Sequence, residues 1–223
     1  MNRLLTTTLP LVILGACLLL LGISQNTHSK EKMADKQTTA IPPVPEGYQT
    51  ATLSAGCYWC VEAVYQRLDG IHSITSGFIG GHVANPSYEQ VCAETTGHAE
   101  AVYIIFDPKI ITFEKILDWF WRLHDPTTLN RQGGDIGTHY RSGIFYQNEE
   151  QKKLATASRN RAQDSFPRPI VTEITKATTF YPAKVSHQDY YRIVGNKNPY
   201  CRAVIAPKLK KLKLDQKADK SGE

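Results

Sequence analysis

Two cysteines three residues apart, Cys57 and Cys60, are the residues of this sequence best suited to chemistry. A cysteine sulfur is a nucleophile as its thiolate, and two thiols at this spacing can form a disulfide. A glycine precedes Cys57, and the aromatic residues Tyr58 and Trp59 follow it. Most free cysteines are simply small buried hydrophobes. The glycine, the aromatic pair and the second cysteine together favour a reactive sulfur at position 57.

The residues around Cys57 predict the element that positions it. Apolar residues at 61, 64, 65 and 68 have the spacing of an amphipathic helix, and Asp69-Gly70 is typical of a helix end. An extended segment at 48–53 comes first. Cys57 is therefore expected at the first turn of a helix, where unpaired N–H groups favour a thiolate over a thiol.

Composition bounds the class of protein. The chain has 223 residues, 41% hydrophobic and 21% charged, which suits a single globular domain. The net charge of +5 includes a basic run at 208–220, and no nucleic-acid module accompanies it. We therefore expect no nucleic-acid binding.

The N-terminus is typical of an exported protein. Arg3 is followed by an uncharged apolar run at 9–23, which is short for a membrane-spanning helix. A signal peptide cleaved before Gln25, a lipoprotein box ending at Cys17 and an uncleaved anchor are all compatible with it. In each case the domain is expected to be periplasmic, or membrane-anchored and facing the periplasm. The predicted organisation is a signal peptide or anchor at 1–24, a proline-rich linker at 25–47, a catalytic domain at 48–207 and a basic disordered tail at 208–223.

Strands and helices are predicted to alternate through the domain. Apolar and polar residues alternate in the expected strands, and the expected helices have apolar faces or capping residues. This order predicts a mixed sheet covered by helices. The expected strands are 71–79, 98–106, 140–146 and 170–176, and the expected helices are 87–92, 112–123, 148–163 and 186–194.

The four cysteines of the domain allow several interpretations. An exported protein with an even number invites a disulfide framework, but a domain of this size does not need one. A single C-x-x-C pair is poor zinc spacing, so we expect no metal and no cofactor. A thioredoxin-like oxidoreductase has the same cysteine spacing, but its usual proline between the cysteines is absent here. A non-enzymatic thiol protein is a further alternative.

Several motifs then occur in a fixed order, and together they resemble the peptide methionine sulfoxide reductases of the A type over about residues 50–207. Two residues depart from the pattern of that family: Tyr58 replaces a phenylalanine, and His139 replaces a common glutamine. The motifs are Gly-Cys-Tyr-Trp at 56–59, Ser-Gly-Phe-Ile-Gly-Gly at 76–81, Asn-Pro-Ser-Tyr at 85–88, Thr-Gly-His-Ala-Glu at 96–100, His-Asp-Pro-Thr at 124–127, Asn-Arg-Gln-Gly at 130–133, Asp-Ile-Gly-Thr-His-Tyr-Arg-Ser at 135–142, Phe-Tyr at 180–181 and His-Gln at 187–188.

The resemblance implies a fold and a reaction. The fold is α+β, a two-layer α/β sandwich with a mixed sheet, a ferredoxin-like split β-α-β core and long coil segments. The reaction is reduction of the S epimer of methionine sulfoxide, free or in proteins, by attack of the Cys57 thiolate on sulfur. Glu100, kept protonated by burial, supplies the proton. The remaining implied roles are phenol donors at Tyr88 and Tyr140, a pocket residue at Asp135, and an apolar wall for the S-methyl group at Tyr58 and Trp59.

The implied cycle needs a second thiol and a reductant. Attack leaves Cys57 as a sulfenic acid, which condenses with a resolving cysteine. Cys60 is one helical turn away, whereas Cys201 resembles the C-terminal resolving site of the family; a mobile tail around Cys201 favours the latter. Cys92 is expected to be buried and inert. A thioredoxin-type dithiol would then reduce the disulfide of a monomeric enzyme.

Overall fold

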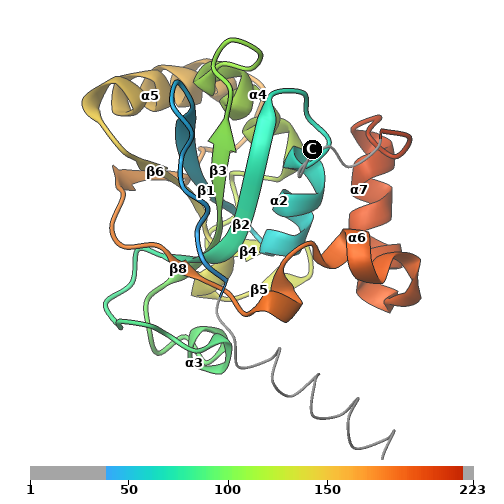
Figure 1. Cartoon of the computed structure of the whole chain (residues 1–223). Coiled ribbons are helices and arrows are strands. Elements are labelled where there is room, and N and C mark those ends of the chain that lie inside the picture. Colours follow the sequence, from blue (N-terminus) through green and yellow to red (C-terminus); the bar gives the residue numbers. More distant parts are fainter. Residues whose placement is uncertain (1–38, 218–223) are drawn as a thin grey trace, which may run out of the picture. The chain divides into compact units, whose positions relative to one another are not determined.

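The structure is a computed structural model that describes residues 39–217 (Figure 1). The expected signal peptide or anchor, most of the linker and residues 218–223 lie outside the described residues. Within residues 39–217, no helix has the length and apolar character needed to cross a membrane.

A six-stranded mixed sheet carries the domain, in the order β7-β6-β1-β3-β2-β8. Strand β3 is antiparallel to both β1 and β2, so β1 and β2 are parallel to one another with β3 between them. Helix α2 (Tyr58–Tyr65) connects them. This is the expected split β-α-β core, and the parallel pair β6–β7 makes the sheet mixed. The strands are β1 Gln49–Ala55, β2 Ile71–Ile79, β3 Ala99–Phe106, β6 Ser142–Tyr146, β7 Glu173–Lys176 and β8 Tyr181–Pro182.

Helices α3, α4 and α5 begin where the sequence places a capping residue, whereas α6 and α7 have no side-chain cap. Side chains of Ser87, Thr112 and Asn148 accept backbone N–H groups at the starts of α3, α4 and α5, as expected for N-caps. The bounds of these five helices are α3 Tyr88–Cys92, α4 Phe113–Leu123, α5 Glu149–Gln163, α6 Tyr190–Val194 and α7 Ala206–Lys211. The long polar stretch at 124–138 contains a small hairpin of β4 (Arg131–Gln132) and β5 (Asp135–Ile136).

The sheet has a helical layer on one face. Side chains of α2, α4 and α5 share the main buried cluster with those on one face of the central strands. The Tyr65 hydroxyl donates to the Ile116 carbonyl at 2.8 Å and so ties α2 to α4. On the opposite face, a small cluster at the ends of β2 and β3 is covered by coil that includes Ala177 and Phe180. The two-layer arrangement agrees with the predicted fold class.

The folded part of the chain extends further toward the C-terminus than expected. Helix α7 and the turn after it bury Leu209, Leu212 and Leu214, which are 1%, 6% and 2% exposed. The prediction of a disordered tail from residue 208 is therefore wrong for residues 208–214. The lysines between these leucines are exposed, so the segment is amphipathic. Its positive charge alone did not indicate that one face of the segment packs on the domain. Figure 1 shows α6 and α7 on the same side of the sheet as α2.

Candidate active site

Cys57 is the N-cap residue of α2, immediately after β1, and is 7% exposed. The preceding Gly56 has φ +86°, and a Cβ there would lie 2.6 Å from Cβ of Gln132. The glycine therefore permits both the left-handed turn and the close approach of the β4–β5 hairpin. These two requirements set the direction in which the Cys57 side chain leaves the sheet.

The pKa of the Cys57 thiol is raised well above its ordinary value. Burial is the main cause, followed by the interactions of the thiol with Cys60 and with Glu100. The expected thiolate at the helix N-terminus is thus outweighed by desolvation. Cys57 rests as a thiol, and its proton has to leave during the reaction.

Glu100 lies on β3 with its side chain on the helical face of the sheet, and it is 1% exposed. Its Oε2 accepts the backbone N–H of Tyr58, the first residue of α2, at 3.0 Å. Burial raises the pKa of this carboxyl group to about 8. The group is therefore mostly protonated at neutral pH and lies directly beside the start of the catalytic helix.

Two half-buried phenols, Tyr88 and Tyr140, lie in the same electrostatic neighbourhood. Burial raises the pKa of each, and ionisation of Glu100 or Cys57 would raise it further. Both hydroxyl groups thus remain protonated donors. His139, next to Tyr140, is 4% exposed and its Nδ1 has no partner among the described residues.

Cys60 belongs to a chain of polar contacts below Cys57. Its Sγ lies 3.5 Å from the Tyr200 hydroxyl, which donates to Oδ2 of Asp135 at 2.7 Å. The hydrogen bond from Cys57 lowers the pKa of Cys60 to about 7, with help from the charge of Lys208. The two thiols of the C-x-x-C pair therefore influence one another's ionisation, and Cys60 is the more acidic.

Cys201 does not lie in a mobile tail. It is the first residue of a π-helix, Cys201–Ile205, and is 0% exposed. Its backbone N–H donates to Oδ1 of Asn198 at 3.3 Å. Burial raises the pKa of its thiol. The premise that favoured Cys201 as the resolving residue is thus absent from the structure.

The expectation that Cys92 is buried is wrong. Cys92 ends the five-residue helix α3, in which only Val91 is buried, and its side chain is exposed. Partial burial of the sulfur raises the pKa of the Cys92 thiol, and the neighbouring Tyr88 opposes that rise. A helix this short cannot cover both of its faces, which the apolar neighbours in the sequence did not reveal.

Aromatic side chains surround His187 on the outer side of α2. The Tyr58 hydroxyl lies 2.6 Å from His187 Nδ1, and the Trp59 indole N–H donates to the His187 carbonyl at 3.2 Å. The Trp59 ring stacks on that of Tyr190 with centroids 3.7 Å apart and 8° between planes. The Tyr88 ring meets His187 edge-on at 4.6 Å.

Sequence reasoning missed the roles of His187, Tyr190 and Tyr200 in building this site. His187 occurs in one of the recognised motifs, and the adjacent aromatics at 190 and 191 were a visible signal. Their contacts with α2 join residues more than 120 positions apart. No local pattern reports such a contact.

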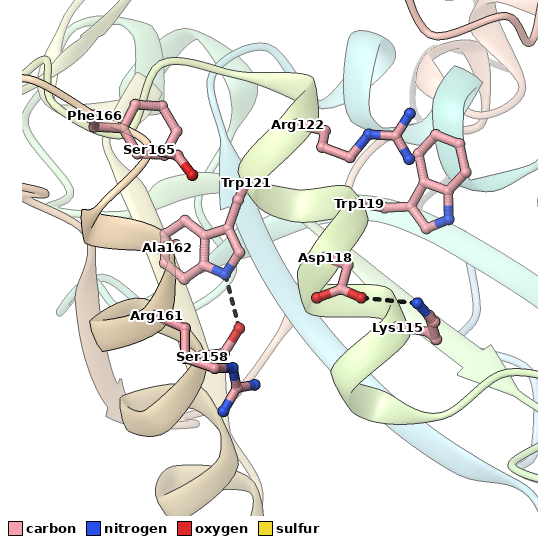
Figure 2. A pocket seen from close by; sticks show the side chains of 10 residues that line it. All are labelled: Lys115, Asp118, Trp119, Trp121, Arg122, Ser158, Arg161, Ala162, Ser165 and Phe166. Carbon is pink, nitrogen blue, oxygen red and sulfur yellow. Dashed lines mark hydrogen bonds and ion pairs between the residues drawn. The ribbon is translucent and has the colours of Figure 1, made fainter.

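A separate cavity of about 440 Å³ lies between α4 and α5 (Figure 2). Trp119, with Arg122 over its ring at 4.2 Å, and Trp121, whose indole N–H donates to Ser158, are among its lining residues. None of the cysteines or acids described above lines it. Within residues 39–217, no three His, Cys, Asp or Glu side chains are grouped to hold a metal ion.

Comparisons with known proteins agree with this geometry. The family model described as peptide methionine sulfoxide reductase matches residues 49–221. The peptide methionine sulfoxide reductase MsrA of Saccharolobus solfataricus is 52% identical over 163 residues, which cover 73% of this chain and 92% of that protein. The MsrA of Leptospira borgpetersenii is 51% identical over 175 residues, covering 78% and 99%.

Solved structures give the same result. Reduced Mxr1 from Saccharomyces cerevisiae matches with a TM-score of 0.65 and 33% identity, over 74% of this chain and 91% of that one. Methionine sulfoxide reductase A of Corynebacterium diphtheriae matches with a TM-score of 0.60 and 28% identity, over 74% and 89%. The matched region contains the buried cysteine pair and the protonated acid described above. The chain therefore belongs to the peptide methionine sulfoxide reductase family, A type.

Proposed function

We propose that the domain reduces the S epimer of methionine sulfoxide with Cys57 as nucleophile and Glu100 as proton donor. The observation that carries this proposal is the position of the buried Cys57 thiol beside Glu100 at the start of α2. The backbone N–H of Tyr58, the residue after Cys57, donates to the protonated Glu100 carboxyl group. Attack of the Cys57 sulfur on the substrate sulfur forms an S–S bond, and the protons of the Cys57 thiol and of Glu100 convert the departing oxygen to water as the S–O bond breaks. Water then attacks the Cys57 sulfur, the S–S bond breaks with its electron pair going to the substrate sulfur, and the released proton returns to Glu100. The substrate becomes a thioether and Cys57 becomes a sulfenic acid, so two electrons pass from Cys57 to the substrate sulfur.

The other site residues have supporting roles. The oxygen that leaves the substrate becomes more basic as the S–O bond weakens, so protonated donors beside it lower the barrier. Tyr88 and Tyr140 keep their protons because burial raises the pKa of both. Tyr58 and Trp59 supply aromatic faces for the S-methyl group. Asp135 orients Tyr200 and, through it, Cys60.

Cys60 is the resolving residue in this proposal. Cys60 lies one helical turn from Cys57 on α2, and the charge of Lys208 and the hydrogen bond with Tyr200 both lower the pKa of its thiol. Attack on the Cys57 sulfenic acid forms the Cys57–Cys60 disulfide and releases water. Cys201 is packed in a helical segment and would have to leave it first.

A thioredoxin-type dithiol then reduces the disulfide and restores both thiols. The solved complex of Saccharomyces cerevisiae Mxr1 with Trx2, which matches this chain with 26% identity and a TM-score of 0.50, supports this partner. We further propose an exported, monomeric domain, periplasmic or anchored facing the periplasm, because of the apolar run at 9–23. Cell fractionation that recovers full-length protein in the cytosol would contradict the export proposal, and size-exclusion chromatography tests the monomer.

Cysteine variants test the proposed cycle. With dabsylated methionine sulfoxide, Cys57→Ser should abolish turnover with dithiothreitol. Cys60→Ala should form about one equivalent of methionine per enzyme but fail to cycle with thioredoxin, because the resolving thiol is missing. Cys201→Ala should cycle within about threefold of wild type, since Cys201 takes no part in this step. The opposite result for the last two variants would assign resolution to Cys201.

The same assay separates the alternative functions. A thiol protein that only binds partners would show no sulfoxide turnover. A general disulfide oxidoreductase would reduce insulin disulfides without reducing methionine sulfoxide. Mass spectrometry of the oxidised protein would identify the disulfide directly.

A further inference from the structure

One buried acid takes no part in the chemistry proposed above. Glu62 is 1% exposed, and it is the only charged residue between positions 55 and 65. Its Oε1 accepts the Ser76 hydroxyl at 3.2 Å and the Asp189 backbone N–H at 2.9 Å, while Oε2 accepts the Tyr190 N–H at 3.1 Å. A buried carboxyl group with three donors is a specific anchor, because each lost partner leaves a desolvated polar group.

The two backbone amides belong to residues 187–190, called here the cover segment. Its first residue, His187, contacts Tyr58 through the phenol hydroxyl and Trp59 through the indole N–H. Its last residue, Tyr190, stacks on the Trp59 ring. The cover segment therefore forms the outer side of the aromatic wall made by Tyr58 and Trp59.

Two features show that the cover segment needs an anchor. Asp189 has φ +52°, a left-handed conformation that costs a non-glycine residue free energy. The Gln188 side chain fixes the segment to β2, since it accepts the Ser76 N–H at 2.8 Å and donates to the Ser76 carbonyl at 2.9 Å. That contact fixes one point only. Glu62 fixes the backbone of the next two residues, where the chain turns into α6.

We propose that Glu62 is a positioning residue for substrate binding. By holding two amides of the cover segment, it keeps His187 and Tyr190 against the aromatic wall and so sets the shape of the S-methyl site. This inference rests on the proposed function of Tyr58 and Trp59. It makes Glu62 important for substrate affinity and leaves the sulfur chemistry of Cys57 unchanged.

The substitution Glu62→Gln tests this role. At pH 8, where Glu62 is mostly ionised, a glutamine side chain has the same shape but only one strongly accepting oxygen, so at least one amide of the cover segment loses its acceptor. The KM for methionine sulfoxide should rise about 5- to 20-fold, the size expected for one unsatisfied buried amide. The single-turnover rate at saturating substrate should stay within about twofold of wild type, because the substitution weakens binding of the substrate and of the transition state equally. The control Ser76→Ala removes only the hydroxyl donor and should change KM less than about twofold.

A double-mutant cycle separates positioning from general stability. If Glu62 acts through the cover segment, Glu62→Gln should add little to the KM of a Tyr190→Ala enzyme, because the stacked ring is already absent. If the two substitutions raised KM independently, so that their fold-changes multiplied in the double variant, the proposal would be overturned. An unchanged KM in an active Glu62→Gln enzyme, with only a lower Tm, would also overturn it and leave the proposed function intact. Absence of sulfoxide turnover in the wild-type enzyme would instead contradict the proposed function.

Hydrogen exchange of the wild-type enzyme gives a test that needs no variant. The Asp189 and Tyr190 amides should exchange at least about 100-fold more slowly than exposed amides, because both are bound to a buried carboxyl group. If Glu62→Gln fails to fold, this measurement decides the question. Exchange of both amides at the rate of an exposed peptide would overturn the anchor.

Discussion

Replacing Glu100 with glutamine removes the transferable proton while keeping the shape of the side chain. The amide oxygen can still accept the Tyr58 N–H that Oε2 accepts at 3.0 Å, so the start of α2 should stay in place. A positioned general acid contributes about 10²- to 10⁴-fold to a rate. We therefore expect the single-turnover rate of Glu100→Gln to fall at least about 100-fold at pH 7.

The pH dependence sharpens this prediction. With a pKa of about 8, Glu100 is about nine-tenths protonated at pH 7 and about one-tenth protonated at pH 9. If proton donation limits the rate, the wild-type rate should fall about tenfold across this range, and Glu100→Gln should lack this decline. If deprotonation of Cys57 were limiting, the rate would rise with pH, because burial raises the pKa of that thiol.

The measurement is a rapid-quench single turnover without reductant, with methionine quantified by chromatography at each pH. This isolates formation of the sulfenic acid from disulfide formation and recycling. The matched variant Glu173→Gln, at a carboxylate that pairs with Arg141 away from the cysteines, should retain the wild-type pH profile. A rising wild-type profile, or a Glu100→Gln enzyme within tenfold of wild type at pH 7, would refute the role of Glu100.

Three further predictions follow from particular contacts. Tyr58→Phe should keep activity within about threefold and lower the free energy of unfolding by about 1 kcal/mol, because it removes one hydroxyl hydrogen bond. Chemical denaturation should show that Leu209→Ala costs about 2–5 kcal/mol, whereas the exposed Lys210→Ala costs under about 0.5 kcal/mol; equal effects would contradict a packed C-terminal segment. Burial raises the pKa of Glu62 to about 7, above its unfolded value of 4.5, so its contribution to stability is full below pH 4.5 and is lost as pH rises through 7. Denaturation between pH 4.5 and 8 should therefore show a decline, of up to about 3 kcal/mol from this group, that is absent in Glu62→Gln.

The sequence by itself determined the elements that depend on neighbours along the chain. Alternation over 71–79 predicted β2 with its observed bounds, and Thr112 and Asn148 marked the starts of α4 and α5. Capping and periodicity are local properties, so they can be read without knowing the fold. The motif order around Cys57 likewise indicated the family and the nucleophile before any geometry was available.

Only the tertiary structure decided the properties that depend on burial and on distant contacts. Desolvation makes Cys57 a thiol where the helix terminus alone predicted a thiolate, and the interaction with Cys57 lowers the pKa of Cys60, which is the more acidic partner. Packing encloses Cys201 and leaves Cys92 exposed, the reverse of what was expected for each. The contacts of Glu62 span more than 120 residues. A pKa depends on solvent and charge in three dimensions, and neither can be counted along the chain.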